Sequence, residues 1–473
     1  MGKYKYLIKN IGLLTLSSFG TKLLTFFLVP LYTSVLSTSE YGTFDLTYTT
    51  VSLLIPILTM SIMESTLRFS LDKNADQQEI FSISLRIIIR SIVSFIVCII
   101  LNYYLELFPF INNNIVFFCM YYIVMLAQQL LQAFARGIDH VADIAVSGVL
   151  NSAVMITLNI VFLLYFRLGL TGYFLAYIIG LLTTSIYLSV RIKIWKYIRF
   201  SGLKKSKEKE MLSYSKPLVV NSISWWINNA SDRYVVTWIC GLAANGVYSV
   251  GYKIPSILSV FQTIFNTAWQ LSTVRAYDKE DTDGFFKNIY SLYNLVMVFG
   301  CSLMIVLTRL LARFLYAKDF FGAWRYVPFL MMAVVFGALI GVFSGVFQAV
   351  KDSKSQGKIT VVGAVINLVL NIILTLWIGA TGAAIATAVA YFIMWLLNLY
   401  YIRKYIIIKI QIKRDIFSYV LLLLQTVLML WFADSIPLYL VQLIICGIIL
   451  LLYSEEVRTI IQQFVSIIAG KRK

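Results

Sequence analysis

Long apolar runs separated by short polar linkers fill this sequence from end to end. A helix needs about 20 predominantly apolar residues to cross a bilayer core about 30 Å thick, because each residue rises about 1.5 Å. Of the 473 residues, 60% are hydrophobic and only 13% are charged, a balance that soluble globular chains do not show. The chain is therefore predicted to be an all-α, polytopic integral membrane protein without a soluble domain. About fourteen spans are expected, at 11–36, 44–69, 81–106, 115–136, 142–166, 170–194, 214–240, 245–272, 285–312, 325–350, 357–378, 381–403, 416–433 and 437–454.

Lys and Arg are unevenly distributed among the linkers, and this sets the expected orientation. Basic linkers remain in the cytoplasm, so the pattern predicts that both termini are cytoplasmic. One expected outer linker disagrees, since Arg309, Arg313, Lys318 and Arg325 flank it. Snorkelling to the headgroups and a basic mouth for an anionic substrate both remain open for these four residues. The basic linkers are 191–209, 275–287, 351–358 and 403–414, whereas 37–42, 107–114 and 379–381 hold no Lys or Arg.

The two halves of the chain resemble each other. The motif at 40–44 after the first span matches 244–248 after the seventh, and the stretch 159–172 matches 371–382. The two matches are offset by 204 residues (Gly42 to Gly246) and 210 residues (Gly172 to Gly382), which indicates a duplicated six-helix unit. Duplicated lobes around a midplane cavity are the usual layout of a transporter.

The repeat predicts four regions. An N-terminal six-helix lobe covers 1–194 and a second six-helix lobe covers 214–404. Between them, 195–213 alternates basic and apolar residues and is expected to be an amphipathic helix on the inner leaflet. Residues 405–473 are expected to form two additional helices, peripheral to any pathway, and a basic cytoplasmic tail.

The seventh span carries an unusual group of polar residues, Asn228, Asn229, Asp232 and Arg233. An ionised side chain in the middle of a membrane helix costs about 2.5–3.5 kcal/mol on insertion scales, so such groups usually face water or a partner. On a helix Asn228 and Asp232 share one face, with Asn229 and Arg233 beside it. The pattern predicts that this face is wet. Asp232 could orient Arg233 or limit the positive charge of an empty cavity, and both roles remain open.

Further candidates for substrate binding are spread over other spans. Lys22 lies well inside the first apolar run and is the strongest candidate for a phosphate contact, with a snorkelling or paired lysine as the alternative. Arg68 is expected to pair with Glu64 in a structural ion pair, because the two are four residues apart. The remaining candidates are Arg136 on the fourth span, Lys253, and Asn266 and Gln270 on a polar stripe of the eighth span, where cavity lining is favoured over helix packing.

The sequence lacks the residues that several classes of chemistry require. His140 is the single histidine, and the five cysteines have no CxxC spacing, so neither a metal site nor a cofactor is expected. No nucleophile elbow or Gly-rich phosphate loop is present, which predicts that the chain is not an enzyme. The net charge of +18 is spread over the linkers, which favours anionic lipid or an anionic substrate over nucleic acid.

Five motifs together resemble the polysaccharide-transporter branch of the multidrug/oligosaccharidyl-lipid/polysaccharide flippases, which includes the O-antigen and capsule repeat-unit flippases. The resemblance covers essentially the whole chain. It implies two lobes that alternate between inward- and outward-open states in a bacterial plasma membrane. It also implies an undecaprenyl-diphosphate-linked oligosaccharide as substrate, with a polysaccharide polymerase and chain-length machinery as possible partners. The motifs are Pro30-Leu31-Tyr32, Glu40-Tyr41-Gly42-Thr43-Phe44-Asp45, Ser65-Thr66-Leu67-Arg68-Phe69, Ser231-Asp232-Arg233-Tyr234 and Gly246-Val247-Tyr248-Ser249-Val250-Gly251-Tyr252-Lys253.

The implied substrate agrees with the charged candidates. Lys22, Arg233 and Lys253 could offset the lost hydration of a diphosphate by charge-assisted hydrogen bonds in a low-dielectric cavity. A cation-coupled exporter of drugs or small molecules is the alternative within transport. A membrane polymerase or ligase is a third alternative, although it would need a large outer loop and every outer linker here is short.

Overall fold

The computed structural model describes residues 26–72, 74–199, 201–350, 352–432, 434–459 and 461–462, and every regular element within them is a helix. Nine of these helices are long and apolar enough to cross a membrane, or ten if one bent pair counts as a single span. The prediction of an all-α, polytopic membrane protein is therefore confirmed. Of the fourteen predicted spans, 11–36 lies largely outside the described residues, and 214–240, 245–272 and 437–454 are helices too polar or too short for that count.

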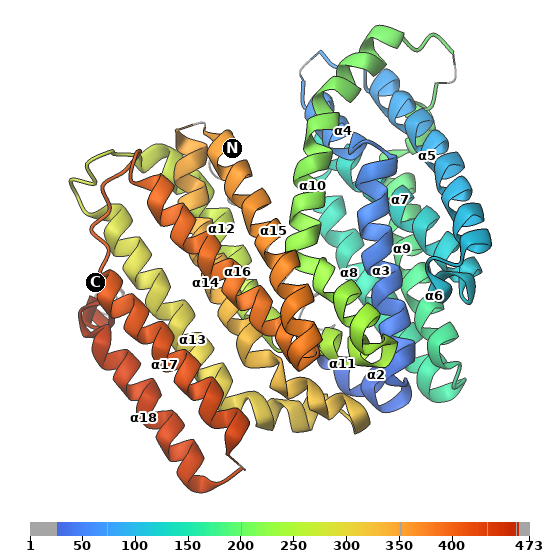
Figure 1. The fold of residues 1–473 in the computed structure, drawn as a ribbon. Coiled ribbons are helices and arrows are strands. Elements are labelled where there is room, and N and C mark those ends of the chain that lie inside the picture. Colours follow the sequence, from blue (N-terminus) through green and yellow to red (C-terminus); the bar gives the residue numbers. More distant parts are fainter. Residues whose placement is uncertain are drawn as a thin grey trace, which may run out of the picture. The chain divides into compact units, whose positions relative to one another are not determined.

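The chain forms two compact units (Figure 1). The first unit comprises residues 1–237 and 241–246, and the second unit comprises 238–240 and 247–473. The helices of the first unit are α2 (Val29–Val35), α3 (Thr38–Leu58), α4 (Ile62–Ser70), α5 (Gln77–Leu105), α6 (Pro109–Asn112), α7 (Ile115–Gly137), α8 (Val141–Ile160) with its π-helical continuation η1 (Val161–Tyr165), α9 (Gly169–Ile192), η2 (Ile194–Tyr197) and nearly all of α10 (Lys205–Cys240). Helix α11 (Leu242–Gly251) begins in the first unit and ends in the second.

The second unit contains the remaining helices, and α17 and α18 lie beside α13 in it (Figure 1). Its elements are α12 (Pro255–Ala276), α13 (Phe285–Leu315), η3 (Lys318–Arg325), α14 (Val327–Ala349), α15 (Ser353–Ile378), α16 (Ala380–Ile402), α17 (Ile412–Trp431) and α18 (Ile436–Leu452).

The same helix neighbours recur in both units. In the first unit α9 packs on α7 and α8, and α4 packs on α5 and α7. In the second unit α16 packs on α14 and α15, and α12 packs on α13 and α14. Gly172 and Gly382, which the sequence repeat pairs, also have similar surroundings, because a Cβ at either would overlap the preceding helical segment. The packing therefore repeats as the sequence does, while the predicted lobe boundaries remain a prediction.

The predicted span 44–69 is broken. Helix α3 begins with a capping box in which Ser37 and Glu40 satisfy each other's backbone N–H groups. Pro56 lies inside α3, and Met60 and Ser61 then adopt left-handed backbone angles, with φ of 52° and 54°. Since proline removes a helical hydrogen bond and the left-handed residues end the helix, α4 restarts at an angle of 62° to α3.

The prediction of one amphipathic helix between the lobes is wrong, because the segment is not a single helix. Lys193 has a left-handed φ of 57° and ends α9, the short helix η2 follows, and Gly202 has a φ of 73°. The backbone N–H of Arg199 donates to Ser82 Oγ at 2.8 Å, and that of Lys204 donates to Glu79 Oε1 at 2.9 Å. The segment is thus held along α5, and the good helix formers from Lys205 onward extend α10 instead.

Two polar networks attach the additional helices to α13. Gln425 of α17 accepts from Ser302 of α13 at 2.8 Å and exchanges side chain–backbone hydrogen bonds with Gln442 of α18 at 3.1 and 2.9 Å. Near the far end of α13, Arg309 and Arg313 both pair with Asp434, each at 2.5 Å. Neither of the two sequence interpretations of these arginines included this pairing, which gives both a structural partner.

Candidate functional site

The described part of the first unit contains a largely buried ion pair between Arg233 of α10 and Asp45 of α3. Arg233 Nε lies 3.0 Å from Asp45 Oδ2, and the two side chains are only 16% and 14% exposed. Asp45 lies two turns after Thr38, the first residue of α3, and Arg233 lies two turns before Cys240, the last residue of α10. At 1.5 Å per residue, the pair is about 10 Å inside those ends. A largely buried cation is therefore held against a carboxylate, well inside the ends of both helices.

Sequence reasoning identified Arg233 but missed Asp45. Asp45 belongs to the motif quoted for the family resemblance and is an ionisable residue inside a predicted span. That was a usable signal, because intramembrane charges are rare and usually paired. The sequence does not reveal the partner, since residues 188 positions apart meet only through packing of α3 on α10. Asp232, for which the sequence left two roles open, accepts from the backbone N–H of Arg233 at 2.9 Å.

Other contacts fix the register of α10 on α3. The indole N–H of Trp226 donates to the carbonyl oxygen of Thr49 at 2.9 Å, and the hydroxyls of Thr50 and Tyr234 are hydrogen-bonded. Arg233 Nη1 also donates to the carbonyl oxygen of Asn229 at 3.0 Å, one turn earlier. The guanidinium is thus held between its own helix and Asp45.

The face of α10 that was predicted to be wet is only partly exposed. Asn228 and Asp232 are each 2% exposed, and Asn228 donates to the carbonyl oxygen of Ser224 at 3.0 Å. Asn229, on the neighbouring face, is exposed. A small polar side chain that bonds its own helix is compatible with packing, and this is why helical periodicity alone identified the polar positions but not which face is accessible.

A cluster of tyrosines reaches the ion pair through Tyr41. Tyr32 and Tyr41 stack with ring centroids 5.1 Å apart, and Phe44 packs on Tyr173 and Tyr177 at 4.5 and 4.6 Å. Tyr41 is close enough to interact electrostatically with both Asp45 and Arg233. Such an apolar but hydroxyl-bearing wall lowers the local dielectric and strengthens charge interactions.

The other basic candidates of the first unit lie at helix ends. Arg68 pairs with Asp72 at 2.7 Å, not with Glu64, and both partners are about half exposed. The predicted Glu64–Arg68 pair is therefore wrong: Asp72, just beyond the end of α4, supplies the carboxylate instead. Arg136 is exposed in the last turn of α7. Lys22 lies outside the described residues.

The remaining candidates belong to the second unit. Lys253 is half-buried in the short break between α11 and α12. Asn266 packs on α14, where a Cβ at Gly341 would overlap its side chain. Trp269, on the same face, donates to the carbonyl oxygen of Val342 at 2.9 Å. Close approach of a polar stripe to glycines is typical of membrane helix packing, so this contact gives Asn266 a packing role. The side chain of Gln270 lies outside the described residues.

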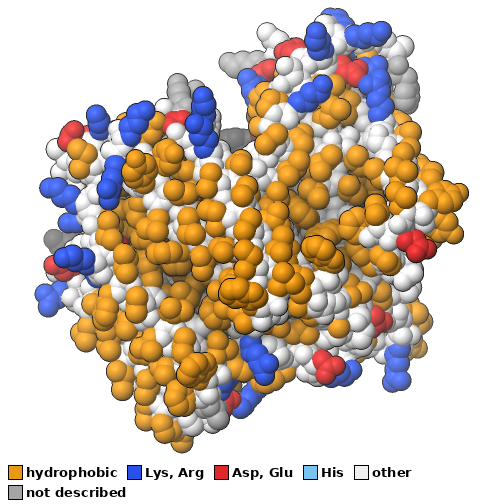
Figure 2. Space-filling model, in the orientation of Figure 1, with side chains coloured by type: hydrophobic (Ala, Val, Ile, Leu, Met, Phe, Trp, Pro, Cys, Tyr) orange, Lys and Arg blue, Asp and Glu red, His pale blue; other side chains and the backbone are white. Residues whose placement is uncertain are grey.

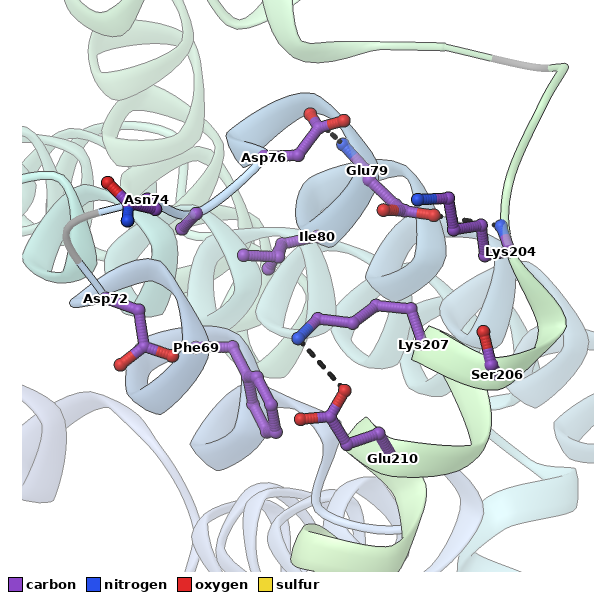
Figure 3. A pocket seen from close by; sticks show the side chains of 11 residues that line it. Phe69, Asp72, Asn74, Asp76, Glu79, Ile80, Lys204, Ser206, Lys207 and Glu210 are labelled. Carbon is purple, nitrogen blue, oxygen red and sulfur yellow. Dashed lines mark hydrogen bonds and ion pairs between the residues drawn. The ribbon is translucent and has the colours of Figure 1, made fainter.

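An open pocket of about 450 Å³ lies where α4, α5 and the start of α10 meet (Figure 3). Asp72, Asp76, Glu79 and Glu210 line it, and Lys207 reaches across it to Glu210 at 3.1 Å. The carboxylates outnumber the lysines, so this pocket does not suit an anion. Within the described residues, no group of three or more His, Cys, Asp or Glu is arranged to hold a metal ion.

Solved structures identify the class of fold. An inward-facing multidrug resistance MATE family transporter of the MOP superfamily is 15% identical, with a TM-score of 0.66 over 81% of this chain and 94% of that one. The lipid II flippase MurJ in an inward closed conformation is 16% identical, with a TM-score of 0.69 over 94% and 99%. A MOP superfamily transporter from Pyrococcus furiosus is 14% identical, with a TM-score of 0.57 over 84% and 96%. The chain has the polytopic membrane fold of these transporters.

A family model gives the narrower assignment. The model described as polysaccharide biosynthesis protein matches residues 7–270, more than half of the chain, and the chain belongs to that family. A second model, MatE, matches residues 217–373. No curated protein matches the chain. The family resemblance of the sequence motifs is confirmed.

Proposed function

We propose that this chain is a flippase that moves an undecaprenyl-diphosphate-linked oligosaccharide repeat unit from the inner to the outer leaflet of a bacterial plasma membrane. The glycan would serve capsule, O-antigen or exopolysaccharide synthesis. Membership of the polysaccharide biosynthesis family is the observation that carries this proposal. A fold shared with the lipid II flippase supports it. In this role the chain performs no covalent chemistry, and both termini lie in the cytoplasm.

A diphosphate needs compensating charge to cross about 30 Å of hydrocarbon. Arg233 supplies a guanidinium whose planar donors match phosphate oxygens, and charge-assisted hydrogen bonds are stronger in a site that excludes water. When no substrate is bound, Asp45 neutralises Arg233 at 3.0 Å. Arrival of a phosphate would displace that carboxylate, and its departure would restore the pair. Because the Asp45 carboxylate and the phosphate would replace each other at Arg233, the site could release the substrate as well as bind it.

Other residues complete the proposed path. Lys22 and Lys253 would contact the diphosphate, with Arg68 and Arg136 collecting it at helix ends. The amides of Asn228, Asn229, Asn266 and Gln270 would hydrogen-bond sugar hydroxyls, as Asp232 would. The lobes would alternate between inward- and outward-open states around this path, using the broken span α3–α4 as a flexible point. A polymerase and chain-length machinery would receive the flipped unit.

A cation-coupled exporter of drugs or small molecules is the second candidate. The MatE model, which matches residues 217–373, favours it. In that role Asp45 would take a proton or sodium ion and Arg233 would act as its counter-charge. The two candidates differ in cargo and in their dependence on an imposed gradient.

A paired experiment with sealed vesicles distinguishes them. One set contains the purified protein and a fluorescent lipid-diphosphate oligosaccharide, and an external glycosidase reports the fraction exposed outside. The other set reports accumulation of a fluorescent cationic drug under imposed sodium or proton gradients. Protein-dependent exposure of the glycan supports the flippase. Gradient-dependent drug accumulation without glycan exposure would replace it by the exporter.

A further inference from the structure

A basic pocket of about 520 Å³ lies between α5 and the first turns of α10. Arg86 and Arg90 of α5 line it together with Lys205, Lys209 and Lys216 of α10, and Glu208 is its only acidic lining residue. Glu208 forms ion pairs with both arginines, at 2.5 Å for Arg90. These ion pairs hold α5 and α10 together. Five basic groups against one carboxylate leave a strong net positive charge.

The start of α10 separates this pocket from the acidic one. Lys207 and Glu210 face the acidic pocket, whereas Lys205, Lys209 and Ser213 recur every four residues and face the basic one. Lys and Arg side chains gather at this end of the first unit, above an apolar surface (Figure 2). The linker before α10 is one of the basic linkers expected in the cytoplasm, and in that orientation the pocket would lie at the level of the inner-leaflet headgroups.

The apolar surface below the pocket continues the same face of α5. This face carries, at helical spacing, Arg86, Arg90, Val93 and Val97. Val93 and Val97 are 60% and 52% exposed, and Ile100, one turn further, is 50% exposed. Such a surface on a membrane helix meets acyl chains. A phosphate in the pocket and a chain along α5 would match the two parts of a phospholipid.

From this arrangement we infer that the pocket between α5 and α10 binds the headgroup phosphate of an anionic phospholipid of the inner leaflet, with one acyl chain lying along Val93, Val97 and Ile100. The lysines supply point charges, and the two arginines supply planar donors. A lipid held there would support the attachment of α10 to α5. This lipid site is independent of the transported cargo.

Native mass spectrometry of the purified full chain in detergent tests the site. The fraction of protein with ligand bound is measured in separate titrations with phosphatidylglycerol, phosphatidylcholine, a polyprenyl diphosphate and inorganic pyrophosphate. Phosphatidylglycerol is expected to bind at least about tenfold more tightly than phosphatidylcholine. The triple variant Lys205→Gln/Lys209→Gln/Lys216→Gln is expected to lose that preference, because each charge near an anionic headgroup contributes about fivefold.

The matched control is Lys354→Gln/Lys358→Gln/Lys413→Gln, which removes three exposed lysines of the second unit and should leave the preference intact. Glu208→Gln provides a test of opposite sign, since removal of the only acidic lining residue should raise phosphatidylglycerol affinity severalfold. Equal binding of the two phospholipids, or equal loss in both triple variants, would overturn the site. If the polyprenyl diphosphate bound tenfold more tightly than phosphatidylglycerol at the same lysines, the pocket would be a cargo site. If inorganic pyrophosphate competed as well as phosphatidylglycerol, the acyl chain would contribute nothing to binding. Either result contradicts the inference.

Discussion

Arg233 and Asp45 show what a buried ion pair contributes to a membrane protein. Removing two charges from water is expensive, and pairing them recovers only part of that cost, so such a pair is weak evidence for stability. The Arg233–Asp45 pair is retained about 10 Å inside two helix ends, beside a wall of tyrosines. A functional explanation at residue scale is that Asp45 neutralises the Arg233 guanidinium until an incoming phosphate replaces the carboxylate.

The pair predicts opposite effects of its two neutral variants on substrate binding. Arg233→Gln should weaken binding of a lipid diphosphate in detergent by about tenfold or more, because a charge-assisted hydrogen bond contributes about 1.5–3 kcal/mol. Asp45→Asn should strengthen binding, since it removes the carboxylate that competes for the guanidinium. Titration followed by intrinsic fluorescence measures both. Weaker binding in both variants would instead indicate a purely structural pair.

A second residue-scale prediction concerns pH and a residue outside the membrane spans. Asp352 accepts hydrogen bonds from the backbone N–H of Ser355 at 3.1 Å and from the Tyr405 hydroxyl at 2.5 Å. The bonds to Ser355 and then Tyr405 lower the pKa of Asp352 to about 2. A carboxyl whose folded pKa is lowered stabilises the fold above its unfolded value of about 3.9, and that contribution disappears as the pH falls toward 2.

Carboxyl NMR of selectively labelled protein measures this pKa, with Asp352→Asn to assign the signal. Tyr405→Phe removes one donor and should move the pKa upward. An Asp352 pKa near 4 in the unmodified protein would show that these hydrogen bonds do not persist in solution.

At the scale of elements, two glycines set how closely helices can approach. The backbones of α3 and α11 meet at Gly42 and Gly246, which occupy equivalent places in the sequence repeat. A Cβ at Gly42 would overlap the carbonyl oxygen of Leu242, and a Cβ at Gly246 would overlap that of Thr38. Asn245 adds a hydrogen bond to the carbonyl oxygen of Gly42 at 3.4 Å. The repeated motif therefore serves a backbone contact that no side chain can replace.

Gly246→Ala should destabilise the protein by about 1–3 kcal/mol, because backbone atoms must move apart to admit the methyl group. Gly357→Ala is the matched control, since a Cβ there meets no atom within 4 Å. Alanine at that helical site, where a Cβ enters open space, should be neutral or stabilising by about 0.5–1 kcal/mol. The fraction of monodisperse protein that survives heating compares the two. Equal melting of the two variants would show that the close contact at Gly246 is not maintained.

At the scale of the whole molecule, hydropathy was sufficient to predict helical spans and their approximate order. It could not predict the break at Met60 and Ser61, where backbone angles rather than composition end the helix. It also missed the attachment of α17 and α18, because the pairing of Gln425 with Gln442 and of Arg309 with Asp434 depends on which helices become neighbours. Arg233 and Asp45 were both identifiable as charges in apolar runs, whereas their pairing required the packing of α3 on α10.

The predicted orientation has a direct test. In a variant without native cysteines, single cysteines placed at Lys354 and at Asn113 should react differently with an impermeant maleimide added to intact cells. The cysteine at 113 should label outside, and that at 354 should label only after the membrane is opened. The reverse labelling pattern would invert the topology and would place the basic pocket of α5 and α10 at the outer leaflet.

The central claim is that Arg233 lies on the path of a lipid-linked diphosphate, and leaflet exposure in sealed vesicles tests it most directly. Vesicles containing the wild type, Arg233→Gln or the control Arg403→Gln receive a lipid-diphosphate oligosaccharide labelled on the inside, and an external glycosidase reports its arrival. The wild type and the control should expose the glycan at similar rates. Arg233→Gln should slow exposure at least about tenfold, the effect of losing about 1.4 kcal/mol at the limiting step, while inserting in equal amount. Equal exposure by Arg233→Gln and the wild type would contradict the claim.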